Sequence, residues 1–301
     1  MNKNIFNWVL FSLLSAIWGS SFILIFIGLK FGLTAFEVAS VRIVAAGIVL
    51  LPNCIMYFRK IPKNKLGIVF LSGTIGSLLP AYLFCIAELE IDSSLTGVLN
   101  SLTPIFVIIM GAIFFKVATP KNKIIGIIIA FTGCVLLLLS KGDMGKSNHL
   151  LYTLLVILAT VMYGFNVNMV TKKLHEIPSI YIASVSLCLN AVLALLVLIF
   201  VGFFKHDFTN VAIIKATSAA CILGIGGTAI ATVLFYMLAK SAGGVFASMV
   251  TYGIPFVAIG WGYYFKEQIG YGQFFGLLII LIGVYIANKP KTKFNVKAGE
   301  L

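Results

Sequence analysis

Long apolar runs constrain this chain more than any other feature. About ten stretches of roughly 20 residues carry almost only apolar side chains, without the alternation that barrel strands require. A helix crosses the hydrocarbon core of a bilayer with about 20 such residues. Of the 301 residues, 60% are hydrophobic and 10% are charged, whereas soluble domains carry about 25% charged residues. The sequence predicts an all-α polytopic membrane protein and excludes a soluble single-core domain, a disordered chain and a disulfide scaffold.

Ten transmembrane helices are expected. Their predicted ranges are 7–29, 35–58, 66–87, 93–115, 121–140, 150–171, 178–203, 214–238, 244–265 and 270–288. Ten helices use about 200 residues, so the connections are short and no separate soluble domain fits. The first range is too long for a cleavable signal peptide, and Trp18 and Phe22 fill the part where small residues would be needed.

The basic residues predict the orientation. With the N-terminus in the cytoplasm, the cytoplasmic segments hold 15 Lys and Arg residues, the outer segments hold six, and Arg42 lies inside a span. This bias favours cytoplasmic N- and C-termini, the latter as a basic tail over 289–301. The net charge of +13 is therefore interpreted as positive-inside flanks, and no nucleic-acid partner is expected.

The two halves of the chain resemble each other in order. The matching positions, at offsets of 150 and 151, are Asn100 with Thr251, Pro104 with Pro255, Gly126 with Gly276 and Gly133 with Gly283. These matches predict two five-helix repeats over 7–140 and 150–288. Because five is an odd number, the two repeats enter the membrane in opposite directions. Inverted repeats are common in secondary transporters, whose substrate site lies near the midplane.

Each repeat has a proline near the middle of its fourth helix. A proline inside a helix frees the backbone carbonyl four residues earlier, and here these carbonyls belong to Asn100 and Thr251. Facing a water-filled cavity, these polar groups would form a substrate site, and Pro104 and Pro255 would act as hinges. The alternative is a simple kink healed by a neighbouring hydroxyl.

Other polar or aromatic residues near mid-span are candidate substrate-binding residues. They are Trp18, Asn166, Tyr82 and Tyr252. An amide in the bilayer needs a partner, so Asn166 is expected to face the protein interior or the cavity. Trp18 could equally be a packing residue. The four paired glycines, seven residues apart in each repeat, are interpreted as packing positions of the fifth and tenth helices.

Arg42 is the strongest charge within a predicted span. An ionisable residue inside the membrane indicates function and usually has a partner, and Glu37 or Glu88 could supply it. We interpret the three residues as candidate charge or gating residues, with a structural ion pair or snorkelling of Arg42 as the alternative. The repeat counterpart of Arg42 is Ser186, so the symmetry does not require the charge.

Signatures of catalysis are absent from the sequence. The five Cys have no C-x-x-C pair, the three His lie in predicted loops, and no Walker A, H-E-x-x-H or G-x-S-x-G motif occurs. No metal and no cofactor are expected, and the chain is not expected to be an enzyme. No carboxylate lies at the midplane of a span, which makes proton coupling through a central carboxylate doubtful.

These residues resemble the EamA family of the drug/metabolite transporter superfamily over about residues 7–288. The resemblance rests on W-G-S-S-F from Trp18, Arg42 in the second span, the two proline-bearing spans and the glycine-spaced spans that follow them. It implies an inner-membrane transporter, often an exporter of amino acids and other small metabolites. It also implies a cavity between spans 1–4 and 6–9, with spans 5 and 10 outside. One departure is Lys116, which stands where Glu267 stands in the second half.

The expected function is a secondary transporter that exports small neutral or zwitterionic metabolites, such as amino acids, by alternating access. It is expected in a bacterial inner membrane, with a small-molecule substrate and the lipid bilayer as its partners, and able to work as a monomer. A passive channel-like facilitator is the alternative. A membrane-embedded enzyme acting on lipid-linked substrates is disfavoured, since the acidic cluster at 88–92 has no histidine beside it.

Overall fold

The computed structural model describes residues 3–91, 93–140, 150–257 and 271–288. Within these ranges the regular secondary structure is helical and no residue lies in a strand, so the predicted all-α class is confirmed. Three expected features lie outside the described residues: the tail 289–301, the ninth span beyond residue 257 with Glu267, and the loop 141–149.

The first half of the chain forms eight α-helices interrupted by short segments. They are α1 (Lys3–Gly19), α2 (Ser21–Lys30), α3 (Ala35–Tyr57), the 3-10 turn η1 (Phe58–Lys60), α4 (Lys63–Gly73), the π-helix η2 (Thr74–Leu78), α5 (Leu79–Ala87), α6 (Ser93–Asn100), α7 (Thr103–Phe115) and α8 (Lys121–Ser140).

The second half follows the same plan. Its described elements are α9 (Leu150–Lys173), α10 (Ser179–Phe200), the 3-10 turn η3 (Phe203–Lys205), α11 (Val211–Ile222), the π-helix η4 (Leu223–Ile230), α12 (Ala231–Ala242), α13 (Gly244–Ser248), the 3-10 segment η5 (Met249–Gly253), a helical turn over 254–257 and α15 (Tyr271–Asn288).

By length and composition, seven helices of the described chain could cross a membrane, and Gly244–Val257 and Phe274–Asn288 are shorter apolar helices. The protein is therefore a polytopic membrane protein, while the number of ten spans stays a prediction. Polar residues place some of the ends. Thr34 caps the start of α3: its hydroxyl accepts from the Glu37 backbone N–H, while the Glu37 side chain accepts from the Thr34 N–H. This capping box satisfies N–H groups that the helix start leaves without partners.

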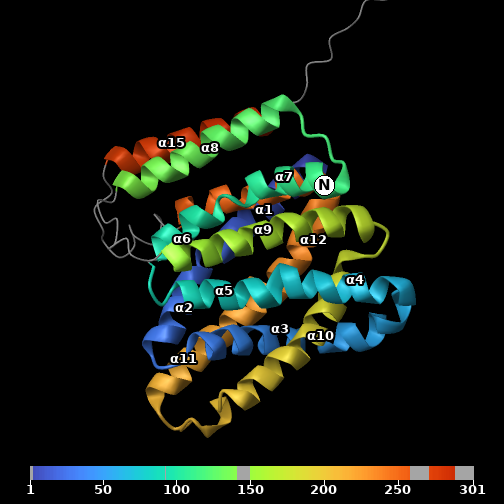
Figure 1. The fold of residues 1–301 in the computed structure, drawn as a ribbon, viewed down its shortest axis with the longest axis vertical. Coiled ribbons are helices and arrows are strands. Elements are labelled where there is room, and N and C mark those ends of the chain that lie inside the picture. Colours follow the sequence, from blue (N-terminus) through green and yellow to red (C-terminus); the bar gives the residue numbers. More distant parts are fainter. Residues whose placement is uncertain (1–2, 92, 141–149, 258–270, 289–301) are drawn as a thin grey trace, which may run out of the picture.

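The helices of the two halves interleave (Figure 1). α3 packs along α10, and α8 packs along α15 at one end of the molecule. α1 contacts α12 and η5, and in the same way α9 contacts α5 and α7. The contacts of α1 with the second half correspond to the contacts of α9 with the first half, as expected for a duplicated arrangement.

Glycines bring α8 and α15 into backbone contact. A Cβ built on Gly126 would lie 2.4 Å from the Ala287 N and 2.5 Å from the Gly283 O. A Cβ on Gly133 would lie 2.8 Å from the Gly276 O. The prediction that these four glycines are packing positions of the fifth and tenth helices is confirmed.

The largest buried cluster includes residues from the N-terminal part of α1. Leu10 and Leu14 of α1 pack there with Val107, Val170 and Leu238, which come from α7, α9 and α12. Leu14, Val170 and Leu238 are fully buried, and Leu10 is 4% exposed. This core joins both halves of the chain.

Candidate functional site

Both proline-bearing spans are interrupted at the same place in their repeat. In the first half, α6 ends at Asn100 and α7 begins at Thr103, with Pro104 in its first turn. In the second half, α13 gives way to the 3-10 segment η5, and helical geometry resumes at 254, one residue before Pro255. Transporters often build substrate sites at such discontinuous helices.

Spans three and eight carry π-helical segments at matching positions. η2 supplies Gly76 and Ser77 to the interior, and η4 supplies Gly227 and Thr228, an offset of 151 residues. A π-turn widens the helix and changes the direction of the side chains that follow, and such turns are frequent at functional sites. The four irregular segments therefore meet around one space.

That space is a cavity of about 100 Å³, which has room for several water molecules. Its described lining comes from spans 1–4, 6, 8 and 9, and the described residues of α8, α10 and α15 contribute none. The seventh span, α10, was expected to border the cavity and does not. The polar and aromatic lining residues are Trp18, Ser21, Phe22, Arg42, Ser77, Phe84, Asn100, Thr103, Tyr163, Asn166, Thr228, Thr232, Phe235, Tyr236, Ser248 and Thr251. The expected position of spans 5 and 10 outside the cavity agrees with this arrangement.

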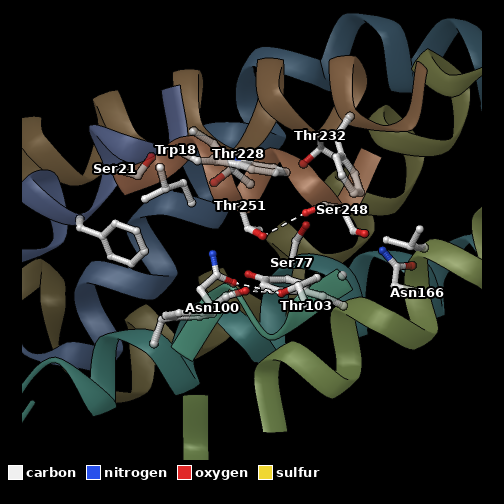
Figure 2. Close-up of a pocket in the computed structure, with 18 of the residues that line it drawn as sticks. Trp18, Ser21, Ser77, Asn100, Thr103, Asn166, Thr228, Thr232, Ser248 and Thr251 are labelled. Atoms are coloured by element: carbon white, nitrogen blue, oxygen red, sulfur yellow. Dashed lines mark hydrogen bonds between the residues drawn. The ribbon is translucent and has the colours of Figure 1, made fainter. Parts of the chain in front are cut away.

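Asn100 and Thr251 face the cavity from the two interrupted spans, as Figure 2 shows. Both side chains are buried. Their backbone carbonyls are not free, which corrects the expectation drawn from the prolines. The Asn100 carbonyl accepts from the Thr103 hydroxyl at 2.7 Å, and the Thr251 carbonyl accepts from the Ile254 backbone N–H. The kinks are thus healed within the chain, and the side chains remain as the polar groups of the cavity wall.

Trp18 and Asn166 approach the cavity from the first and sixth spans. The Trp18 indole N–H donates to the Gly227 carbonyl at 3.0 Å, so the ring is tied to the π-helix η4. The Asn166 amide nitrogen donates to the Tyr236 hydroxyl at 3.2 Å. The Asn166 amide oxygen is buried without a hydrogen-bond partner among the described residues. A donor on a bound solute, or a water molecule, would satisfy this oxygen.

Arg42 reaches the cavity from α3. Its Nε donates to the Thr228 hydroxyl oxygen at 2.6 Å, which links the second span to η4. Glu37, one of its two expected partners, contacts His206 and Thr34 instead. The Glu37 Oε1 lies 2.8 Å from the His206 Nε2, and its Oε2 accepts from Thr34. Glu88 lies at the end of α5 and is not a lining residue.

Two expected tyrosines lie away from the cavity. The Tyr82 hydroxyl is 2.7 Å from the Ser40 hydroxyl, and its ring packs on Phe36. Tyr252 is fully buried, and its hydroxyl donates to the Ile127 carbonyl of α8 at 3.0 Å. Both side chains hold helices together. Apolar periodicity does not say which side of a buried helix meets a cavity, because neighbouring helices surround it on several sides.

Sequence reasoning missed the lining residues of the π-helices. Ser77 and Thr228, like Gly76 and Gly227, stand at the same offset of 151 that relates Asn100 to Thr251. That offset was the available signal. The π-turns themselves leave no mark in composition, so the direction of these side chains could not be read from helical periodicity.

Comparisons with known proteins agree with this architecture. The family model of the EamA-like transporter family matches residues 6–139 and again residues 150–289. A curated relative, an uncharacterized transporter of Archaeoglobus fulgidus, is 33% identical over 131 residues, which are 44% of this chain and 47% of the relative. The match thus spans about half the length of that protein.

A solved crystal structure of a protein shares the fold. It superposes with a TM-score of 0.70 over 93% of this chain and 95% of that chain, at 13% sequence identity. This similarity concerns the fold alone. The family match covers nearly the whole chain, and the curated relative bears the name of a transporter. The chain is a membrane protein of the EamA-like transporter family, within the drug/metabolite transporter superfamily.

Proposed function

We propose that this protein is a secondary transporter that exports small neutral or zwitterionic metabolites, such as amino acids, by alternating access. The observation that carries the proposal is the central cavity, at which two interrupted spans and two π-helical segments meet. Hydroxyl, amide and aromatic side chains dominate its lining. Among the described lining residues, only Arg42 is charged. Such a wall suits a small polar or amphipathic solute better than a multiply charged one.

The paired construction of the cavity supports the proposal of alternating access. In the two repeats, Trp18 corresponds to Tyr163, Ser77 to Thr228, and Asn100 to Thr251. Two halves of similar shape and opposite direction can exchange roles, so that one end of the bundle opens while the other end closes. Pro104 and Pro255, beside the interruptions, are the proposed hinges.

The orientation is proposed from the basic residues, with both termini in the cytoplasm. The end of the bundle that holds Leu10 and Leu14 then faces the cytoplasm. We further propose a bacterial inner membrane as the location and a single chain as the working unit.

Export is tested by the metabolite content of the medium. Cells that produce the protein are compared with cells that produce the double variant Asn100→Leu/Thr251→Val, at equal amounts in the membrane. The exposed Thr132→Val in α8 serves as the control. Amino acids or related metabolites should accumulate outside with the wild type and the control only. Equal profiles for all strains would contradict export through this cavity.

A further inference from the structure

Arg42 brings a positive charge into a cavity whose other described lining residues are uncharged. In a site with little water, a single cation attracts an anionic group strongly. The lining includes no Asp or Glu among the described residues.

The guanidinium is oriented by a hydrogen bond on one of its edges. Its Nε donates to the Thr228 hydroxyl oxygen at 2.6 Å. This uses one of the five N–H donors of an arginine, and the two Nη groups carry the other four. The Nη donors form a planar fork that matches the two oxygens of a carboxylate.

A close backbone contact places Thr228 beside Arg42. A Cβ on Gly224, at the start of η4, would lie 2.3 Å from the Arg42 carbonyl oxygen. Because glycine has no Cβ, η4 can press against α3 at this point. Thr228 follows four residues later and meets the guanidinium.

The symmetry-related crossing, which also joins the two halves, carries no charge. A Cβ on Gly73, the repeat counterpart of Gly224, would lie 2.7 Å from the carbonyl oxygen of Ser186, the counterpart of Arg42. Ser186 is fully buried, and its hydroxyl donates to the Ala183 carbonyl within α10. The fold therefore does not need an arginine at this crossing. The charge has a role that the backbone arrangement does not explain.

We propose that Arg42, oriented by Thr228, binds the carboxylate of the transported solute. The proposal rests on the proposed transport function and narrows its substrate class to small molecules with one carboxylate, amino acids among them. One guanidinium balances one negative charge. A dicarboxylate or a phosphate monoester would bring further charge into the cavity without a partner, and an amide or amine would leave Arg42 without an anion.

The test uses three compounds that share one side chain. Phenylalanine carries a carboxylate and an ammonium, 3-phenylpropionate carries the carboxylate alone, and phenylalaninamide carries the ammonium alone. Purified protein in proteoliposomes loaded with unlabelled amino acids takes up a labelled amino-acid mixture by counterflow. Each compound is then added as a competitor to the wild type and to the variants.

In the wild type, both carboxylate compounds should inhibit at concentrations about tenfold or more below that of the amide, since charge-assisted hydrogen bonds are the strong ones. Arg42→Gln should remove this difference while leaving inhibition by the amide unchanged. Arg42→Lys should keep a reduced difference, because lysine provides a point charge without the fork. Arg59→Gln, which changes an exposed arginine, is the control and should behave as the wild type.

Three outcomes would overturn the proposal: Arg42→Gln keeps the tenfold difference, it weakens all three competitors equally, or Glu88→Gln reproduces its effect. The last two would make Arg42 a structural residue. If Arg42→Gln does not fold, Arg42→Lys and Thr228→Val decide in its place, and a full tenfold difference in both contradicts the proposal. Absence of counterflow in the wild type would instead overturn the proposed transport function.

Discussion

Asn100 and Thr251 each combine a hydrogen-bonded backbone carbonyl with a side chain that lines the cavity. Their carbonyls are bonded within the chain, to the Thr103 hydroxyl and to the Ile254 N–H. Backbone groups left without partners at this depth would be costly. The side chains are thereby left as the groups that face the cavity.

Gly76 provides a test at the scale of single residues. A Cβ at Gly76 would lie 2.1 Å from the amide nitrogen of Asn166 and 2.7 Å from its Cγ. Gly76→Ala should therefore displace Asn166 and reduce the transport rate several-fold or more, with a loss of about 1–3 kcal/mol in stability from overpacking. Transport and the apparent melting temperature in detergent are measured together.

Gly67→Ala is the matched control, because a Cβ at Gly67 in the same span meets no atom within 4 Å. It should leave both quantities within error of the wild type. Equal behaviour of the two alanine variants would show that Asn166 does not need its present position.

The elements of this fold are readable from sequence to different degrees. The long apolar runs gave the helical class, and the proline positions pointed to Asn100 and Thr251 at the cavity wall. The π-turns were not foreseeable, since a single extra residue in a helical turn has no compositional signature. The mistaken positions of Tyr82 and Tyr252 have a related cause, because both helices are buried on several sides and only packing decides which side meets the cavity.

The pair α8 and α15 forms a scaffold outside the cavity. Gly126→Ala would bring a Cβ within 2.4 Å of the Ala287 N and 2.5 Å of the Gly283 O, which are backbone atoms that cannot move aside alone. We expect a lower apparent melting temperature, from about 1–3 kcal/mol of overpacking. Transport at a temperature where the variant is folded should persist, since no described residue of either helix lines the cavity.

Ile125→Ala is the control for this change, because Ile125 is 52% exposed. It should leave the melting temperature close to that of the wild type. A Gly126→Ala variant as stable as this control would mean that the α8–α15 contact relaxes without loss.

At the scale of the molecule, the two halves are tied together beyond the cavity. Glu37 takes part in the cap of α3 in the first half, and its Oε1 lies 2.8 Å from the His206 Nε2 in the second half. The Glu37 side chain is 3% exposed. A buried carboxylate that loses a partner is costly. His206→Ala should therefore lower the free energy of unfolding by about 1–3 kcal/mol.

His175→Ala is the comparison for that variant, since His175 is exposed in the segment between α9 and α10. Chemical unfolding in detergent, followed by tryptophan fluorescence, measures both. If the two histidine variants are equally stable, the Glu37–His206 contact contributes nothing to holding the halves together.

The central claim is that a small solute crosses the membrane through the cavity at Asn100 and Thr251. Counterflow in proteoliposomes tests it most directly, because uptake of label against an internal unlabelled pool requires alternating access and is not given by a channel. Wild type and Thr132→Val should accumulate labelled amino acids transiently, and Asn100→Leu/Thr251→Val should reduce the initial rate about tenfold or more, as expected when buried polar contacts to a solute are removed. Undiminished counterflow by the double variant would contradict the account.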